Sequence, residues 1–143
     1  MNKVFKIDSG LYPLGVLTIV TGIGLHLAGH GANHHVWEIW AAVHTVIAAA
    51  FTVLMANHIR THKAWFKNLR RSAMPRKRLA TTALAVLFLL TMVSGIILLA
   101  VWGVNTPFGL LHYKVGLVFT LLVLGHGAKR LPVIRKAWAA KGR

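Results

Sequence analysis

Apolar residues gather into four long runs along the chain, separated by short polar stretches. The runs cover about residues 11–29, 37–59, 79–102 and 108–127, and residues 1–10 form a polar tail ahead of the first. Each run has about the 20 residues that a helix needs to cross a bilayer. The first run lacks a small-residue cleavage site, which favours a retained helix over a signal peptide. The pattern predicts an all-α fold, a transmembrane four-helix bundle.

The second and fourth runs repeat one motif: a histidine, six residues, Phe-Thr-x-Leu, three residues and another histidine. The first copy runs from His44 to His58, and the second runs from His112 to His126. On a helix, 14 residues rise about 21 Å and return to within roughly 40° of the starting face. Each helix therefore presents two imidazoles on one side, one near each membrane surface.

The first and third runs also match, because Leu-Thr-x-Val-Thr/Ser-Gly-Ile occurs at residues 17–23 and again at residues 90–96. The whole chain is thus predicted to be a single membrane domain, residues 1–143, built from two repeated helix hairpins at about 11–66 and 79–130. Repeats of the same topology imply a pseudo-two-fold axis along the membrane normal.

Charge is lopsided, with 17 Lys and Arg against 2 acidic residues. The bases lie at the edges of the apolar runs, so we expect contact with membrane lipid and no nucleic-acid partner. Every base except Lys114 falls in the N-terminus, the middle loop or the C-terminus. The positive-inside rule therefore predicts a multi-pass protein of the bacterial inner (cytoplasmic) membrane with both termini inside. The second and fourth runs then point the same way.

This direction puts His44 level with His112, and His58 level with His126. Neutral imidazoles in lipid need partners, and haem iron supplies one for each ring. The sequence has no cysteine, so the haems would be noncovalent, b-type and ligated by two histidines each. We therefore predict two haem b groups, an outer one at His44 and His112 and an inner one at His58 and His126.

Other residues are assigned to the haems by position. Gly22 and Gly95 allow close approach of a flat macrocycle or of a neighbouring helix. The bases placed to pair with haem propionates are Arg60, Lys129 and Arg130 on the inner side and Lys114 on the outer side. Snorkelling to the membrane surface explains Lys114 equally well.

The five remaining histidines lie outside the repeat. His26, His30 and His34 are spaced i, i+4, i+8, which suits either a transition metal or, as we favour, a solvated face beside a turn. His62 competes with His58 as a ligand, and we prefer His58 because it has a counterpart in the second copy. The candidate quinone and proton-exchange groups are Glu38, His35 and His26 on the outer side and His62 on the inner side.

With these motifs, the chain resembles the small bacterial cytochrome b family of four-helix, two-haem membrane subunits. Examples are the cytochrome b subunits of membrane-bound formate dehydrogenases and hydrogenases. The hairpin that carries His44, His58 and the trailing His62-Lys-Ala-Trp also resembles a small His-hairpin membrane domain of unknown function. The resemblance covers about residues 15–130. It implies a subunit that relays electrons between the quinone pool and a periplasmic redox partner.

Such a protein would be an electron-transfer subunit of an oxidoreductase complex and not a stand-alone enzyme. The expected partner is a multihaem cytochrome, an iron–sulfur subunit or a flavin subunit, docked on Trp37, Trp40, Trp102 and Phe108. Two alternatives stay open. One is a small His-lined cation or proton transporter or metal-binding membrane protein. The other is a structural subunit whose histidines bond between helices.

Overall fold

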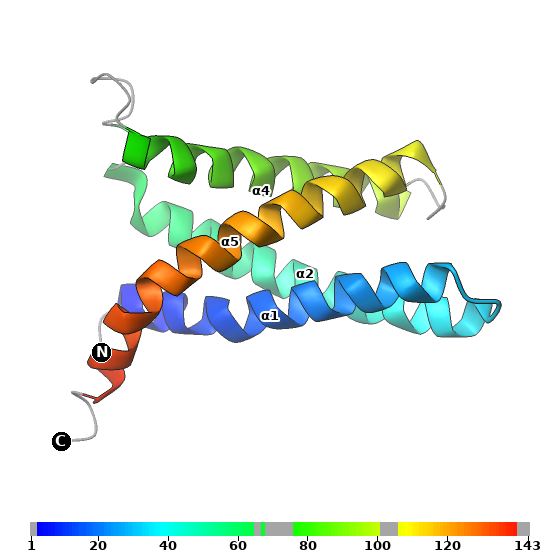
Figure 1. Cartoon of the computed structure of the whole chain (residues 1–143), viewed down its shortest axis with the longest axis horizontal. Coiled ribbons are helices and arrows are strands. Elements are labelled where there is room, and N and C mark those ends of the chain that lie inside the picture. Colours follow the sequence, from blue (N-terminus) through cyan, green and yellow to red (C-terminus); the bar gives the residue numbers. More distant parts are fainter. Residues whose placement is uncertain (1–2, 65–66, 68–75, 101–105, 140–143) are drawn as a thin grey trace. The chain divides into compact units, whose positions relative to one another are not determined.

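The computed structural model describes residues 3–64, 67, 76–100 and 106–139, and within these ranges it contains four helices and no strand (Figure 1). The helices are α1 (Lys3–Gly29), α2 (His34–Thr61), α4 (Arg76–Ala100) and α5 (Pro107–Ala139). All four are long and apolar enough to cross a membrane. The predicted all-α class with four membrane-spanning helices is confirmed.

Helix α1 starts earlier than the sequence pattern suggested. The prediction of a polar tail over residues 1–10 is wrong from Lys3 onward, because that segment is the first part of α1. Its Ile7 side chain is buried and lines a small recess with Asn57 and Arg60 of α2. This packing places Asp8, the next residue, on a helix that faces α2.

Helix α2 begins and ends at clear capping residues. The Asn33 side-chain oxygen accepts hydrogen bonds from the backbone N–H groups of His35, at 3.1 Å, and of Val36, at 3.4 Å. An asparagine in this position satisfies amides that the first helical turn leaves unpaired. At the other end, the His62 backbone N–H donates to the carbonyl oxygens of His58 and Ile59, at 3.3 and 3.1 Å.

Helix α5 starts just after Thr106, whose hydroxyl accepts a hydrogen bond from the Gly109 backbone N–H at 3.2 Å. Pro107 is the first helical residue, where its fixed backbone angle suits a helix and its missing N–H is not needed. The apolar run ends near residue 127, but the helix continues to Ala139. Lys129 and Arg130, expected in a C-terminal tail, therefore lie on α5.

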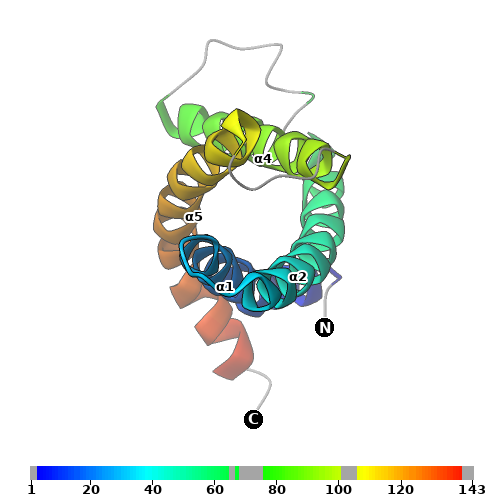
Figure 2. The same ribbon diagram turned by 90° about the vertical axis from the view of Figure 1, so that its right-hand side faces the viewer.

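The chain divides into two compact units, residues 1–73 and 74–143. In the first unit α1 packs along α2, and in the second α4 packs along α5 (Figure 2). Each repeat in the sequence thus corresponds to one helix hairpin. The single membrane domain over residues 1–143 stays a prediction.

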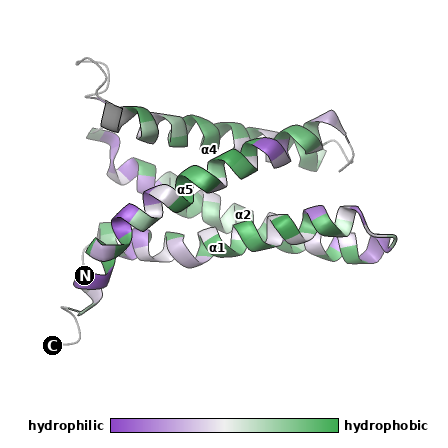
Figure 3. Ribbon diagram, viewed as in Figure 1, coloured by the Kyte–Doolittle hydropathy of each residue, from purple (hydrophilic) through white to green (hydrophobic). Residues whose placement is uncertain are grey.

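Apolar residues run along the lengths of both hairpins (Figure 3), and many of their side chains are exposed. Val46 and Leu121, for example, are 69% and 70% exposed. Among the described residues, the large apolar side chains that are buried are Ile7, Phe51, Phe88 and Phe119. Lipid contact is the arrangement that removes so much apolar surface from water. The chain is a multi-pass membrane protein in contact with membrane lipid.

Candidate functional site

His44 lies on α2 against a buried hydroxyl of α1. The Oγ1 atom of Thr21 is 3.1 Å from Nδ1 of His44. The same hydroxyl donates to the carbonyl oxygens of Leu17, at 2.7 Å, and of Thr18, at 3.2 Å. Thr21 is only 5% exposed. The contact therefore sits inside the first hairpin, away from water.

The second hairpin builds the same arrangement from the repeated residues. The Oγ atom of Ser94 on α4 is 2.9 Å from Nδ1 of His112 on α5. The Ser94 hydroxyl donates to the carbonyl oxygens of Leu90, at 2.8 Å, and of Thr91, at 3.1 Å. Ser94 is 6% exposed. The two copies of the motif thus hold their first histidine in one and the same way.

These contacts assign the protonated nitrogen of each ring. A hydroxyl has one hydrogen, and in Thr21 and Ser94 that hydrogen is directed to main-chain carbonyl oxygens. With its hydrogen on a carbonyl oxygen, each hydroxyl is able to accept from Nδ1–H of the facing histidine, and we assign this tautomer to both rings. In a neutral imidazole, a proton on Nδ1 leaves the lone pair on Nε2. In this tautomer, Nε2 of His44 and of His112 is the nitrogen that could ligate a metal.

Gly22 and Gly95 lie beside these two rings. A Cβ atom at Gly22 would meet Cε1 of His44 at 3.1 Å, and one at Gly95 would meet Cε1 of His112 at 3.2 Å. Such distances are tighter than ordinary van der Waals contact. The repeated glycines therefore make room for the imidazole of their own hairpin. The contact with a macrocycle stays a prediction.

Phe51 and Phe119, midway between the paired histidines, form the core of their hairpins. Phe51 is 7% exposed and lies over Gly15 of α1. Phe119 is 9% exposed and packs on Phe88 of α4, with the ring centroids 6.1 Å apart. Gly15 and Phe88 occupy equivalent positions in the repeat. Both phenylalanines are therefore packed between the two helices of their own hairpin.

His58, the second histidine of the first motif, has a different partner. Its Nδ1 atom is 2.8 Å from Oδ1 of Asp8 on α1. A carboxylate accepts and does not donate, so Nδ1 of His58 carries a proton in this pair, and a neutral His58 ring would keep its lone pair on Nε2. The sequence prediction placed Asp8 in a polar tail and missed this pair. The signal was available, since Asp8 is one of the 2 acidic residues in the chain.

His126 is the corresponding histidine of the second motif, and it is half-buried on α5. In the repeat, the residue of α4 that aligns with Asp8 is Thr81. The two hairpins therefore differ at this level, although they agree at the level of His44 and His112.

His62 lies next to His58 but at the helix end. The ring centroids of the two histidines are 4.7 Å apart, and His62 is exposed at the C-terminal cap of α2. His58 is half-buried and held by Asp8. This difference supports the preference for His58 as the ligand, which stays a prediction.

The histidines around the turn between α1 and α2 do not form the helical series that their spacing suggested. Helix α1 ends at Gly29 and α2 begins at His34, so the i, i+4, i+8 relation stops at the turn. The rings of His26 and His30 meet edge to face, with centroids 4.6 Å apart. His30 and His34 are exposed and flank the turn between α1 and α2.

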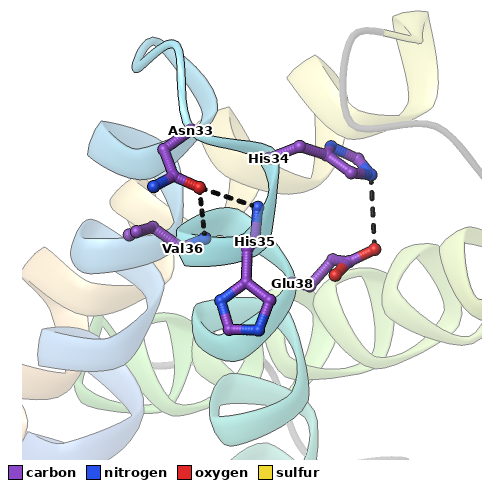
Figure 4. Close-up of polar contacts among 5 residues, drawn as sticks. All are labelled: Asn33, His34, His35, Val36 and Glu38. Carbon is purple, nitrogen blue, oxygen red and sulfur yellow. Dashed lines mark hydrogen bonds and ion pairs between the residues drawn. The ribbon is translucent and has the colours of Figure 1, made fainter.

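Glu38 pairs with His34 and not with His35 (Figure 4). The Nε2 atom of His34 is 3.4 Å from Oε1 of Glu38, and both side chains are largely exposed. His35 contributes its backbone N–H to the Asn33 cap. Among the described residues, no group of three His, Cys, Asp or Glu side chains is placed to hold a metal ion.

The bases assigned to propionates are exposed at helix positions, namely Arg60, Lys114, Lys129 and Arg130. Of the aromatic residues expected on a docking surface, Phe108 is exposed. The Trp40 ring instead lies over Gly24, where an added Cβ would meet it at 2.5 Å. Trp40 is half-buried, its role as a docking anchor stays a prediction, and Trp102 lies outside the described residues.

Comparisons with protein-family models, with curated proteins and with solved structures find no match to this chain.

Proposed function

We propose that this protein is a di-haem b-type membrane cytochrome that acts as an electron-transfer subunit. The observation that carries the proposal is the duplicated hydroxyl–imidazole pair, Thr21 with His44 and Ser94 with His112. Histidines that bind a metal commonly donate their other ring N–H to an acceptor, which fixes the tautomer and the ring orientation. The chain builds this feature in both copies of its sequence repeat.

The residues fit haem on chemical grounds. Three of the four candidate ligands, His44, His58 and His112, have an oxygen within hydrogen-bonding distance of Nδ1, which suits the tautomer that leaves the lone pair on Nε2. Imidazole nitrogen suits haem iron, and the sequence has no cysteine for thioether attachment. Apolar helices provide the surroundings that a macrocycle needs.

The proposed ligand pairs are His44 with His112 for the outer haem and His58 with His126 for the inner haem. This pairing rests on the sequence repeat and on loop charge, which orients both motifs in the same direction. The proposed location is the bacterial inner membrane, with the N- and C-termini in the cytoplasm.

Bound haem would supply one-electron transfer, and two histidine ligands per iron would leave no open position for substrate. The protein's own residues then act by holding ligands. Thr21 and Ser94 keep the outer pair of imidazoles in the Nδ1–H tautomer, and Asp8 does the same for His58. Arg60, Lys129, Arg130 and Lys114 are the proposed propionate partners.

We further propose exchange with the quinone pool and with a periplasmic redox subunit, such as a multihaem cytochrome, an iron–sulfur protein or a flavin protein. Quinone chemistry needs a proton-exchanging group near one haem. Glu38, His35 and His26 at the outer ends of α1 and α2 are candidates, and His62 is the candidate at the inner end. The exposed His34–Glu38 pair supports the outer location.

The experiment is purification in mild detergent followed by visible spectroscopy and addition of a quinol. We expect the sharp reduced bands of six-coordinate, low-spin haem b, and colour that acidic acetone extracts completely. Quinol should reduce both haems, and oxidation should require the periplasmic subunit. A colourless protein contradicts the haem proposal and favours a His-lined cation path. Full turnover by the isolated protein contradicts the proposal that a periplasmic redox subunit is required.

A further inference from the structure

Three histidines of the two motifs lie against two kinds of hydrogen-bonding partner. His44 and His112 face neutral hydroxyls, at 3.1 and 2.9 Å. His58 faces the carboxylate of Asp8, at 2.8 Å. The aligned position in α4 is Thr81, so the repeat does not require an acid there. The difference is therefore a property of the first hairpin.

Asp8 occupies a costly position for an acid. It lies within the apolar span Val4–Gly29, and its side chain is 30% exposed, close to the 28% of its partner His58. Acidic groups within membrane helices are expensive and are placed where they have a partner and a role. The other acid in the chain, Glu38, pairs with His34 at the opposite end of α2 and is largely exposed.

A carboxylate affects a metal-ligating imidazole more strongly than a hydroxyl does. Accepting the Nδ1–H bond with a full negative charge makes Nε2 a better electron donor. Stronger donation stabilises the oxidised iron relative to the reduced iron, and so lowers the reduction potential. The hydroxyls of Thr21 and Ser94 carry no net charge, and they direct their hydrogens to main-chain carbonyls.

We infer that Asp8 is a positioning residue for His58 which also lowers the potential of the inner haem. This inference rests on the proposed function and deepens it. Asp8 would make the haem at the inner membrane surface a stronger reductant than the same haem with a hydroxyl partner. The chain would then favour electron flow from the inner haem to the outer haem.

The test is a redox titration of the purified haem-loaded protein and of the Asp8→Asn variant. The asparagine oxygen still accepts from Nδ1–H, so the variant removes the charge and keeps the hydrogen bond. We expect the oxidation equilibrium of one haem to shift at least tenfold towards the reduced form. That shift is about 59 mV for one electron. The second haem should keep its potential.

Glu38→Gln is the matched control, because it removes the only other acidic charge of the chain. It should leave the potential of the haem that responds to Asp8→Asn unchanged. Asp8→Glu restores the charge and should return that potential towards the wild-type value. If the Asp8→Asn variant loses a haem, the Asp8→Glu variant tests the inference instead. Retention of both haems by Asp8→Glu, with the wild-type potential, supports the inference, and loss of a haem by Asp8→Glu overturns it.

Failure of the inference differs from failure of the proposed function. A wild-type protein without haem overturns both. Two haems whose potentials do not respond to Asp8→Asn overturn only the role of Asp8. An equal response to Glu38→Gln also overturns it, because the effect would then come from net charge and not from the hydrogen bond to His58.

Discussion

The hydroxyls of Thr21 and Ser94 can be removed with little change in shape, by Thr21→Val and Ser94→Ala. Both side chains are at most 6% exposed, so water has little access to replace the lost oxygen. Each substitution removes the acceptor that holds Nδ1–H of one candidate ligand, at 3.1 Å for His44 and 2.9 Å for His112. We expect both variants to fold and to weaken the same haem.

The magnitude follows from the hydrogen bond that is lost. A neutral hydrogen bond contributes about 0.5–1.5 kcal/mol, and a buried donor without an acceptor costs about 1–3 kcal/mol. A free-energy change of about 1.4 kcal/mol corresponds to a tenfold change in affinity. The upper part of the range for an unpaired buried donor therefore corresponds to a roughly 10- to 100-fold loss of haem affinity. Loss of an outer-shell partner of a metal-binding histidine typically has an effect of about this size.

The assay is the rate at which each variant transfers haem to an excess of an apo-globin. Thr18→Val is the matched control, because the Thr18 hydroxyl donates to the Leu14 carbonyl at 2.7 Å on the same helix, one turn before Thr21. It should release haem at the wild-type rate. Wild-type retention by both Thr21→Val and Ser94→Ala would refute the reasoning. If Thr18→Val releases haem as fast as Thr21→Val does, the faster release comes from a change in helix packing and not from the lost contact with His44.

Three further predictions concern the surroundings of the ligands and the membrane topology. Gly22→Ala should displace the His44 ring, which lies 3.1 Å from the added Cβ, and lower haem retention, whereas Gly116→Ala, with nothing within 4 Å, should leave haem content and thermal stability unchanged. His62→Ala should leave both haems in place, measured as haem per chain, and loss of one haem would transfer the ligand role from His58. A reporter fused after Arg143 should be active only if it functions in the cytoplasm, and periplasmic activity would reverse the inner and outer assignments.

The sequence predicts the helices and the repeat because both depend on local patterns. Length and hydropathy identify each span, and the period of the helix puts His44 and His58 on one side of α2. Burial of Phe51 and Phe119 follows from the same period, since each lies on the histidine stripe midway between the ligands.

The partners of the histidines could not be predicted in this way. Thr21 and Ser94 lie inside the repeated segment of the first and third runs, but spacing along one helix does not say which residue of the neighbouring helix lies level with it. That relation depends on the register of the hairpin. Asp8 is missed for another reason, because the polar residues around it have no apolar period that predicts a helix. Ile7 packs inward there and extends α1 to Lys3.

The most direct test of the central claim is the number of haems per chain in paired ligand variants. The wild-type protein should bind two. His44→Ala combined with His112→Ala should retain one, and so should His58→Ala combined with His126→Ala. The crossed combination of His44→Ala with His58→Ala should retain none, because it breaks both sites. Fewer than two haems in the wild type, or complete loss in the His44→Ala, His112→Ala variant, would contradict the account.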